Sequence, residues 1–406
     1  MESIKVNSTL LKNVNRKKIL TVIDETGRLS RVELKKILGK DGKTVTNITN
    51  GLLNDRLITS VGYSSFTGGR RRELLTINPD FGYIIGIHLG IHHIRGVITD
   101  FKNNILVMEK LPITPEESKE SLIHKIRKTL KFLVESKNIP IEQLLGIGFV
   151  ANGFFNSKEG IWINSVNNLY WKNIPIVKIL KEQYNIPIYL EDSSRSMTIA
   201  EKSFGNAKRK DNYIYLDIGA GIGLGVIYKG RLFNGGTHSL AELGHTIVVP
   251  NGDVCSCGNK GCLETVASGW AIKKEVKNRI RNGQKSVILE YCNGDTDNID
   301  SDIIFKAFNN NDKLAEEVLN SASNYLGIAV ANLINLFTPH TIVFGGHLSN
   351  LSSKFITNLK CNIEKFAMPL LFKKVNFLTT GLGDDSAVLG AITLVRDSYF
   401  SINEIK

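Results

Sequence analysis

The sequence predicts an N-terminal winged helix-turn-helix followed by an α/β body. Two observations support this fold class. Residues 1–78 match three short helices and a β-hairpin, and they carry 15 Lys and Arg against 7 Asp and Glu, which is +8 of the chain's +12. From residue 79 onward, strand patterns alternate with helical patterns, as is typical of α/β domains. The length of 406 residues allows two or three domains.

The overall composition restricts the class of protein. Hydrophobic residues make up 42% and charged residues 22% of the chain, which are ordinary values for a soluble globular protein. No apolar run is long enough to span a bilayer, and the first residues lack the apolar core of a signal peptide. We therefore expect a cytoplasmic protein without membrane contact. In that reducing compartment the five cysteines are expected to be thiols or metal ligands.

The basic N-terminal segment contains three helical patterns. Apolar residues at helical spacing predict a helix over 15–26. Ser30 and Glu33 match a capping box, which starts a second helix over 31–38. An Asp-Gly turn then introduces a third helix over 43–54. Two short helices joined by a tight turn are the pattern of a helix-turn-helix.

The third helix is expected to have an apolar and a polar face. Its inward residues are Val45, Ile48, Leu52 and Leu53. Its outward residues, the candidate DNA contacts, are Lys43, Thr44, Thr46, Asn47, Thr49 and Asn50. A hairpin over 57–77 would form the wing, with Arg70, Arg71 and Arg72 at its tip. Such side chains suit phosphates and base edges. A helical bundle with a solvated charged face is the alternative, but the hairpin and the local charge favour DNA binding.

The body begins near Asn78-Pro79. Helices are predicted over 115–137 and 321–337. Strands are predicted for the segments GYIIGIHLG, IRGVITD, LLGIGFV, PIYLED, YIYLDIGAGIGLGVIYKG and TIVFGG, and LLGIGFV is expected to be buried. Glycine-rich turns close several of these strands, which places a ligand cleft there.

One short stretch, residues 240–264, concentrates side chains that bind metals or polar ligands. Three of the five cysteines lie in it, together with one histidine, and these four are His245, Cys255, Cys257 and Cys262. Three sulfurs and an imidazole suit a closed, tetrahedral and therefore structural Zn²⁺ site. Three buried or free thiols are the alternative. Glycines at 252, 258 and 261 permit the tight turns that a chelating loop needs, and they favour the metal.

Residues 217–264 contain DIGAGIGLGVIYKGRLFNGG followed by AELGH, CSCGNKGC and LE. This order of motifs resembles the signature of the ROK family (repressors, open reading frames, kinases). The resemblance runs from about residue 10 to 395 and comes closest to the xylose-repressor branch, with the N-acetylglucosamine-type repressors next. The N-terminal helices and GGRRRELLTIN resemble the winged helix of the family's repressors, which its sugar kinases lack.

The resemblance implies an actin-like, ribonuclease-H-type, two-lobed, sugar-kinase-like body with a monosaccharide in its cleft. The expected domains are the winged helix over 1–78, a first lobe over 79–193 with residues 385–406 packing back on it, and a second lobe over 194–384. The second lobe would hold the zinc site and a dimerisation surface. The resemblance also implies homodimers, or dimers of dimers, on a palindromic operator in double-stranded DNA.

The kinase motifs are degenerate. Where family kinases have Asp-x-Gly-Gly-Thr, the first phosphate loop here begins with His88 and ends with His92. The Gly-Thr-Gly of the second loop has Ala220 in its centre. An ungapped match places Ser193 where the kinases have the catalytic Asp, although a one-residue gap would restore Asp192 as the base. We therefore expect no kinase activity and no catalytic residues.

The resemblance also implies the sugar ligands. The family's glutamates before Gly-His and after the last cysteine match Glu242 and Glu264, and its histidine matches His245, which would serve both zinc and sugar. Asp192 falls on the family's Asn-Asp pair. Asn168 and Trp171 could supply an amide and a stacking ring, or equally a loop anchor and a packed aromatic residue.

The leading functional hypothesis is a DNA-binding transcriptional repressor of carbohydrate metabolism, whose body senses a monosaccharide, xylose or a similar sugar, and modulates operator binding. One alternative is an ATP-dependent sugar kinase that retains a DNA-binding arm. Another is a DNA-binding protein whose cleft is recognised by a protein partner.

Overall fold

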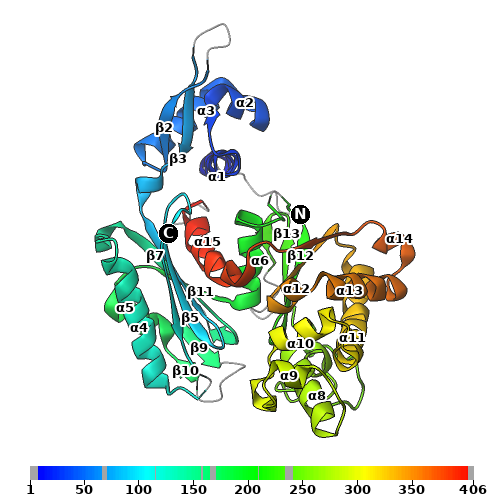
Figure 1. Ribbon diagram of the computed structural model, residues 1–406. Helices are drawn as coiled ribbons and strands as arrows, with labels where there is room; N and C mark the ends of the chain where they lie inside the picture. The colour runs from blue at the N-terminus through cyan, green and yellow to red at the C-terminus, as the bar shows by residue number, and fades with distance from the viewer. Residues whose placement is uncertain are drawn as a thin grey trace. The chain divides into compact units, whose positions relative to one another are not determined.

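The structure is a computed structural model (Figure 1), and it describes residues 8–65, 71–114, 116–156, 159–164, 171–208, 210–233 and 241–400. The chain forms two compact units. Unit 1 is made of Met1–Ala151, Asn156–Glu191 and Ala391–Lys406, and unit 2 of Asn152–Phe155 and Asp192–Gly390. The N-terminal segment is thus grouped with the first half of the body. No helix in the described part of the chain is long and apolar enough to cross a membrane.

The N-terminal segment of unit 1 contains three helices and a small sheet. The helices are α1 (Ser8–Thr26), α2 (Arg31–Leu38) and α3 (Gly42–Asn54). The sheet has the order β1-β3-β2, with β1 at Leu29–Ser30, β2 at Ile58–Tyr63 and β3 at Glu73–Ile77. The three predicted helices and the hairpin are confirmed, although α1 begins at Ser8 and not at residue 15.

Local signals in the sequence explain these boundaries. Ser30 and Glu33 form the predicted capping box at the start of α2. Gly39 ends α2 in the left-handed conformation, at φ +60°, where a side chain would be strained. Asp41 then caps α3 by accepting a hydrogen bond from the backbone N–H of Thr44. Each helix therefore begins and ends where its own residues satisfy the terminal backbone groups.

The core of the N-terminal segment continues into the body of unit 1. Ile19, Leu34 and Leu52 belong to the same buried cluster as Ile84 and Val395. The inward residues predicted for α3 are confirmed, with Val45, Ile48 and Leu52 buried and Leu53 half-buried.

The body of unit 1 is built on a mixed five-stranded sheet of order β11-β7-β4-β5-β6. Strands β4, β5 and β6 are antiparallel neighbours, and β7 runs parallel to β4. The strands are β4 (Tyr83–Leu89), β5 (His93–Asp100), β6 (Ile105–Pro112), β7 (Leu144–Ala151) and β11 (Ile188–Asp192). The smaller elements of this unit are β9 (Ile161–Asn164), β10 (Lys172–Ile174), η1 (Pro79–Phe81) and η2 (Ile141–Gln143). Strand β8 (Phe154–Asn156) lies at the boundary, with Phe154 and Phe155 in unit 2 and Asn156 in unit 1.

Helices cover this sheet (Figure 1). They are α4 (Lys119–Glu135) and α5 (Ile176–Gln183). A side chain at Gly96 of β5 would lie 2.4 Å from Thr129 of α4, so the glycine permits this close packing. A side chain at Gly148 of β7 would likewise meet the Ala391 carbonyl of α15 (Ser386–Phe400) at 2.0 Å.

Unit 2 is built on a second five-stranded sheet, of order β14-β13-β12-β15-β16. Its strands are β12 (Tyr213–Ile218), β13 (Ile222–Tyr228), β14 (Arg231–Leu232), β15 (Thr341–Gly345) and β16 (Asn376–Thr379). Strand β12 pairs antiparallel with β13 and parallel with β15. The α/β body that the sequence predicts is therefore confirmed.

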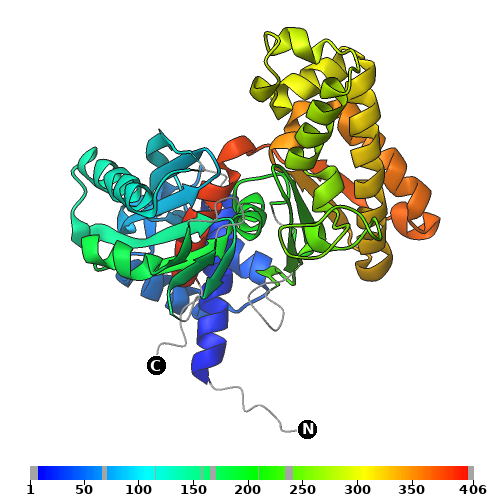
Figure 2. The ribbon, with the colours of Figure 1, turned by 90° about the horizontal axis from the view of Figure 1, so that it is seen from below.

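The helices of unit 2 are α6 (Ser193–Ser203), α7 (Glu264–Ala267), α8 (Gly269–Arg281), α9 (Ile288–Tyr291), α10 (Ser301–Asn309), α11 (Lys313–Phe337), α12 (His347–Leu351), α13 (Ser353–Phe366) and α14 (Pro369–Phe372), with 3-10 turns η3 (Leu243–His245), η4 (Thr296–Asn298) and η5 (Gly383–Asp385). The yellow to orange helices of unit 2, α8 to α13, gather in one group (Figure 2), and α6 packs on strands β12 and β13. The predicted helix over 321–337 is α11, which starts earlier, at Lys313.

Candidate functional site

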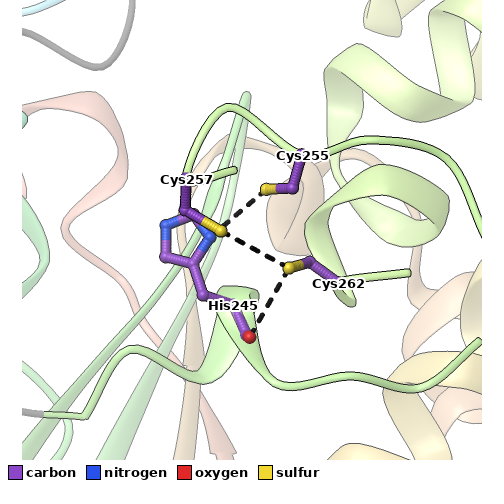
Figure 3. A group of neighbouring side chains, drawn as sticks. All are labelled: His245, Cys255, Cys257 and Cys262. Atoms are coloured by element: carbon purple, nitrogen blue, oxygen red, sulfur yellow. Dashed lines mark hydrogen bonds between the residues drawn. The ribbon is translucent and has the colours of Figure 1, made fainter. Parts of the chain in front are cut away.

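Four side chains of unit 2 meet in one cluster (Figure 3). His245 ends η3, and Cys255, Cys257 and Cys262 lie on the loop that leads to α7. Their ligand atoms all lie within 4.8 Å of one another. The Cys257 and Cys262 sulfurs are 3.6 Å apart, and the Cys255 sulfur is 3.4 Å from Nδ1 of His245. The structure thus brings together all four predicted metal ligands.

The spacing of the cluster fits a tetrahedral metal ion. With Zn–S bonds of about 2.3 Å and Zn–N bonds of about 2.0–2.1 Å, two ligand atoms of a tetrahedron lie roughly 3.5–3.8 Å apart. The S–S separation of 3.6 Å lies within this range, and the S–N separation of 3.4 Å lies just below its lower end. Thiolate and imidazole are also the donors that zinc prefers. The four residues could therefore hold a metal ion.

The chelating loop folds as it does because glycine occupies its tightest points. Gly258 and Gly261 have φ of +93° and +75°. A side chain at Gly261 would lie 1.7 Å from the Val249 carbonyl oxygen, so no other residue fits there. The loop is closed by a hydrogen bond from the Cys255 N–H to the Asn259 carbonyl.

The thiols of the loop differ in acidity. Partial burial tends to raise the pKa of Cys257, but the Asn259 N–H and the neighbouring thiols outweigh it and hold that pKa below the ordinary value. Burial and the other two thiols raise the pKa of Cys262 to about 12. Metal binding requires the thiolate forms, so binding releases protons and stabilises the loop.

Two glutamates flank the cluster. Glu264 is the first residue of α7, and its carboxylate accepts a hydrogen bond from the Ile222 N–H at 3.3 Å. Glu242 is exposed as a whole, but its carboxyl group is partly desolvated, which raises its pKa. The charge of Glu264 raises that pKa further, and His245 and Arg195 oppose the rise. The predicted ligands Glu242, His245 and Glu264 thus share one electrostatic neighbourhood.

The start of α6 supplies a third group of polar residues. Asp192 is the N-cap of α6, and its carboxylate accepts from the backbone N–H groups of Ser194 and Arg195. Ser193 is buried, and its hydroxyl has no hydrogen-bond partner in the described part of the chain. The Asp192 carboxylate is therefore partly used in holding its own helix.

The glycine-rich motif of β12 and β13 is explained by packing. A side chain at Gly223 or Gly225 would lie 1.9 Å from the hydroxyl of Ser194 or Thr198 in α6. These two glycines let the helix approach the sheet. Packing alone therefore explains them, without a phosphate bound at the motif.

The turns that resemble phosphate loops use backbone groups internally. In the first, the Gly90 N–H donates to the His93 carbonyl, and His88 is buried. In the second, the Gly219 N–H donates to the Gly221 carbonyl, and the Gly219 carbonyl accepts from Gly269. A phosphate would have to compete with these bonds for the same N–H groups.

Three charged residues of unit 2 were not predicted from the sequence, and Arg195 and Glu201 are buried while Asp217 is half-buried. Arg195 donates to the Phe233 carbonyl at 3.1 Å, although a cation near a helix N-terminus is electrostatically disfavoured. Asp217 accepts from the Ser194 hydroxyl at 2.8 Å, and burial raises its pKa to about 6. Glu201 accepts from the Thr380 hydroxyl at 2.7 Å. A charged residue inside an apolar strand, as in YLDI, is the signal that could have indicated Asp217.

The candidate DNA contacts on α3 are mostly exposed. These are Lys43, Thr46, Asn47 and Asn50, with Thr44 half-buried. The prediction that Thr49 faces outward is wrong. Thr49 is fully buried because Arg31 of α2 covers it and donates to its hydroxyl at 2.9 Å. Arg71 and Arg72 are exposed next to β3.

Two predicted site residues, Arg70 and Asn168, lie outside the described residues. Trp171 is buried, and its ring N–H donates to the Glu117 carbonyl at 2.9 Å. Of its two predicted roles, the structure supports the packed aromatic residue.

The two sheets and the His-Cys cluster define the class of protein. The model of the ROK family matches residues 84–398, and the chain belongs to that family. Its body has the actin-like fold of the family's sugar kinases. A glucokinase of the family from Streptomyces griseus, in complex with glucose and AMPPNP, matches with a TM-score of 0.69 and 24% identity, covering 78% of this chain and all of that one.

A repressor and a transcriptional regulator match over a larger share of the chain. A xylose repressor from Caldicellulosiruptor bescii is 30% identical over 98% of this chain and 99% of its own length. The crystal structure of a ROK family transcriptional regulator, described as a homologue of the Escherichia coli MLC protein, superposes with a TM-score of 0.80. It is 26% identical and covers 96% of this chain and 97% of its own.

Proposed function

We propose that the chain is a sugar-responsive transcriptional repressor. The observation that carries this proposal is the extent of the match. The xylose repressor aligns with 98% of the chain, and the ROK transcriptional regulator superposes on 96% of it, so both include the N-terminal segment. The glucokinase covers 78%. The N-terminal segment is therefore the part that this chain shares with the two regulators and not with the glucokinase.

The N-terminal segment acts as the DNA-binding domain. Helices α2 and α3 form the helix-turn-helix, α3 enters the major groove, and the β2–β3 hairpin is the wing. Asn47 and Asn50 contact base edges, while Lys43 and the wing arginines neutralise phosphates. Lys43, Asn47 and Asn50 of α3 are exposed, as are Arg71 and Arg72, and this exposure and the net charge of the segment support the assignment. Arg31 holds Asn50 by donating to its side-chain oxygen at 3.1 Å.

The body binds a monosaccharide, xylose or a similar sugar. Glu242, His245, Glu264 and Asp192 are the proposed sugar ligands, since carboxylates accept well from hydroxyl groups. A structural Zn²⁺ held by His245 and the three cysteines would fix the neighbouring glutamates in position. The shared electrostatic neighbourhood of Glu242, His245 and Glu264 supports this site.

The protein regulates and does not phosphorylate the sugar. The internal bonds of Gly90 and Gly219 and the serine at position 193 all oppose the geometry of phosphoryl transfer. A homodimer would place one winged helix on each half-site of a palindromic operator.

Operator binding by the purified full-length protein, titrated with a panel of monosaccharides, tests the proposal. We expect specific binding to a palindromic operator, and a change of affinity with one sugar. Absence of specific DNA binding, or an affinity that no sugar alters, would refute it. Sugar-stimulated ATP hydrolysis would instead support a kinase.

A further inference from the structure

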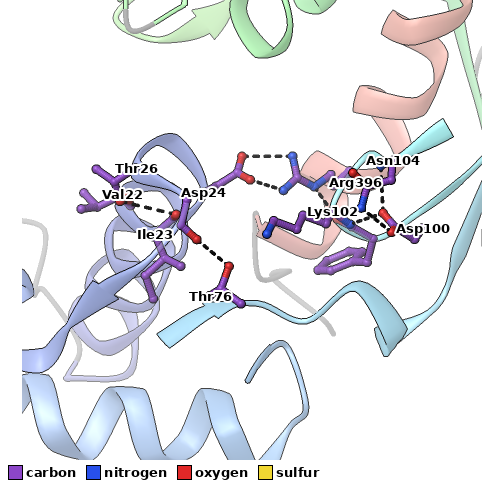
Figure 4. Close-up of polar contacts among 11 residues, drawn as sticks. Val22, Ile23, Asp24, Thr26, Thr76, Asp100, Lys102, Asn104 and Arg396 are labelled. Carbon is purple, nitrogen blue, oxygen red and sulfur yellow. Dashed lines mark hydrogen bonds and ion pairs between the residues drawn. The ribbon is translucent and has the colours of Figure 1, made fainter. Parts of the chain in front are cut away.

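A buried arginine at the end of the chain holds the N-terminal segment to the body of unit 1 (Figure 4). Arg396 of α15 donates through both terminal nitrogens to the carboxylate of Asp24 in α1, one of the two bonds measuring 3.0 Å. Only 3% of Arg396 is exposed. Its guanidinium also lies over the rings of Phe101 and Phe400, 5.8 and 4.7 Å from their centroids.

The third donor of Arg396 is fixed by a rigid turn. Its Nε donates to the Phe101 carbonyl at 2.9 Å. That carbonyl lies in the turn between β5 and β6, where the Asp100 carboxylate accepts from the backbone N–H groups of Lys102 and Asn104. The guanidinium is thus held in one orientation, which is the property that distinguishes a paired arginine from a mobile surface cation.

Asp24 is an unusual residue for its place in α1. A carboxylate near the C-terminus of a helix is disfavoured by the helix dipole. The C-terminal end of α1 is also bonded to the β2–β3 hairpin. The Thr76 hydroxyl of β3 donates at 2.5 Å to the carbonyl of Gly27, the residue that follows α1. A movement of Arg396 would therefore displace α1 and the β2–β3 hairpin together.

The other end of α15 is tied to α6. The Ser196 hydroxyl of α6 donates to the Ala387 carbonyl at 2.9 Å, and a side chain at Gly390 would lie 2.0 Å from the Ser196 carbonyl. Helix α15 begins in unit 2, at Ser386, and ends in unit 1, at Phe400. Helix α6 in turn begins directly after Asp192, a proposed sugar ligand.

We propose that the Arg396–Asp24 ion pair is the joint through which α15 transmits the ligand state of unit 2 to the DNA-binding segment. This inference rests on the proposed function. Arg396 is a positioning residue, since it touches neither the sugar nor the DNA. Loss of the pair leaves sugar binding intact, because its ligands lie in unit 2, and it uncouples operator affinity from sugar.

The test is a double-mutant cycle with Asp24→Asn, Arg396→Gln and the double variant, in the full-length protein. Glu25→Gln is the matched control, because it removes the same charge from the next residue of α1. Two quantities are measured for each protein. They are the affinity for D-xylose by calorimetry, and the ratio of operator dissociation constants with and without saturating D-xylose. If D-xylose does not change the operator affinity of the wild type, it is replaced by the sugar of the panel that does change this affinity.

For the wild type we expect a ratio in the range of roughly 5 to 150 that is typical of allosteric coupling. We expect both single variants and the double variant to bring the ratio close to one, with sugar affinity unchanged. The two losses should not add, because they break one interaction. Asp24→Asn tests the joint even if Arg396→Gln does not fold, since Asp24 is only half-buried.

Two results would overturn the inference alone. One is an Asp24→Asn variant whose ratio of operator dissociation constants equals that of the wild type. The other is a Glu25→Gln variant in which this ratio falls as far as it does in Asp24→Asn. A wild-type protein without operator binding or without any sugar response would overturn the proposed function as well, so the two failures are distinguishable.

Discussion

Asp217 is a half-buried residue near the end of β12, and its carboxyl group is desolvated. Burial raises its pKa to about 6 from an ordinary value of 3.8, and the hydrogen bond from Ser194 only partly compensates. The folded state therefore binds this proton more tightly than the unfolded state. Stability is retained at low pH and is lost as the pH rises from 3.8 through 6. At pH 7 the loss amounts to at most about 3 kcal/mol.

We expect Asp217→Asn to be more stable than the wild type at pH 8 and to lose this advantage toward pH 5. Asparagine keeps an oxygen for the Ser194 hydroxyl but carries no charge to desolvate. Urea denaturation across this range measures the difference. Asp211→Asn, a change of the same type at an exposed residue, should show no such trend. A constant difference between variant and wild type would contradict the shifted pKa.

We expect the side chains of α3 and the wing to make separable contributions to operator binding. We expect Asn47→Ala to weaken specific binding by roughly 1–3 kcal/mol and to leave binding to random DNA unchanged, because base-edge contacts carry the sequence information. Arg71→Ala should weaken binding to both DNAs and reduce its salt dependence. Binding assays at two salt concentrations distinguish the effects. If neither variant differs from the wild type, α3 and the wing do not contact DNA.

Thr49 and Asp217 illustrate what single residues reveal before a structure is known. The helical pattern of α3 predicted its buried residues Val45, Ile48 and Leu52. It could not predict that Arg31, from another helix, covers Thr49 and makes a polar residue part of the interior. The acidity of Asp217 depends on the tertiary structure that buries it, and the sequence holds no information of that kind at short range.

At the scale of elements, boundaries were predictable where the chain carries its own signals. The capping box at Ser30 and the glycine at 39 fixed both ends of α2. Strand β6 was not predicted, because it is a partly exposed edge strand without a continuous apolar face. The polar first turns of α11 likewise hid its true start.

The chelating loop was the most predictable part of the site. Its ligands are close in sequence, and its glycines mark the turns that bring them together. The sugar ligands needed a family resemblance, since Asp192 and Glu264 are far apart in the chain.

The chelating loop should hold one zinc ion per chain. We expect Cys257→Ser to abolish stoichiometric zinc and to lower the midpoint of thermal unfolding by about 5 °C or more, since each kcal/mol corresponds to roughly 2–4 °C in a domain of this size. A strong chelator should have the same effect on the wild type. Metal analysis and calorimetry provide the measurement.

Cys361→Ser is the matched control for the zinc prediction, because Cys361 is an exposed thiol outside the cluster. It should keep the metal and the midpoint. If the midpoint of thermal unfolding of Cys257→Ser equals that of the wild type, the cluster is a group of thiols and not a metal site.

At the scale of the whole molecule, the chain combines a body with the fold of the family's sugar kinases and an N-terminal segment. That segment lies outside residues 84–398, which the family model matches. The two turns that would hold ATP have used backbone N–H groups for their own closure. The acidic residues beside the His-Cys cluster remain accessible, as the exposure of Glu242 shows. This distribution favours a body that has kept the sugar site and lost the nucleotide site.

The same distribution predicts different responses to the two kinase substrates. A sugar present at about 100 times its Kd should stabilise the protein by roughly 2.7 kcal/mol, because it binds the folded state alone. ATP with Mg²⁺ should give no measurable stabilisation, since Gly90 and Gly219 already donate their N–H groups within the turns. Thermal unfolding with each substrate measures both responses, and Glu264→Gln should remove the response to sugar only. Stabilisation by millimolar ATP would mean that the turns open to bind phosphate, and the kinase would then have to be reconsidered.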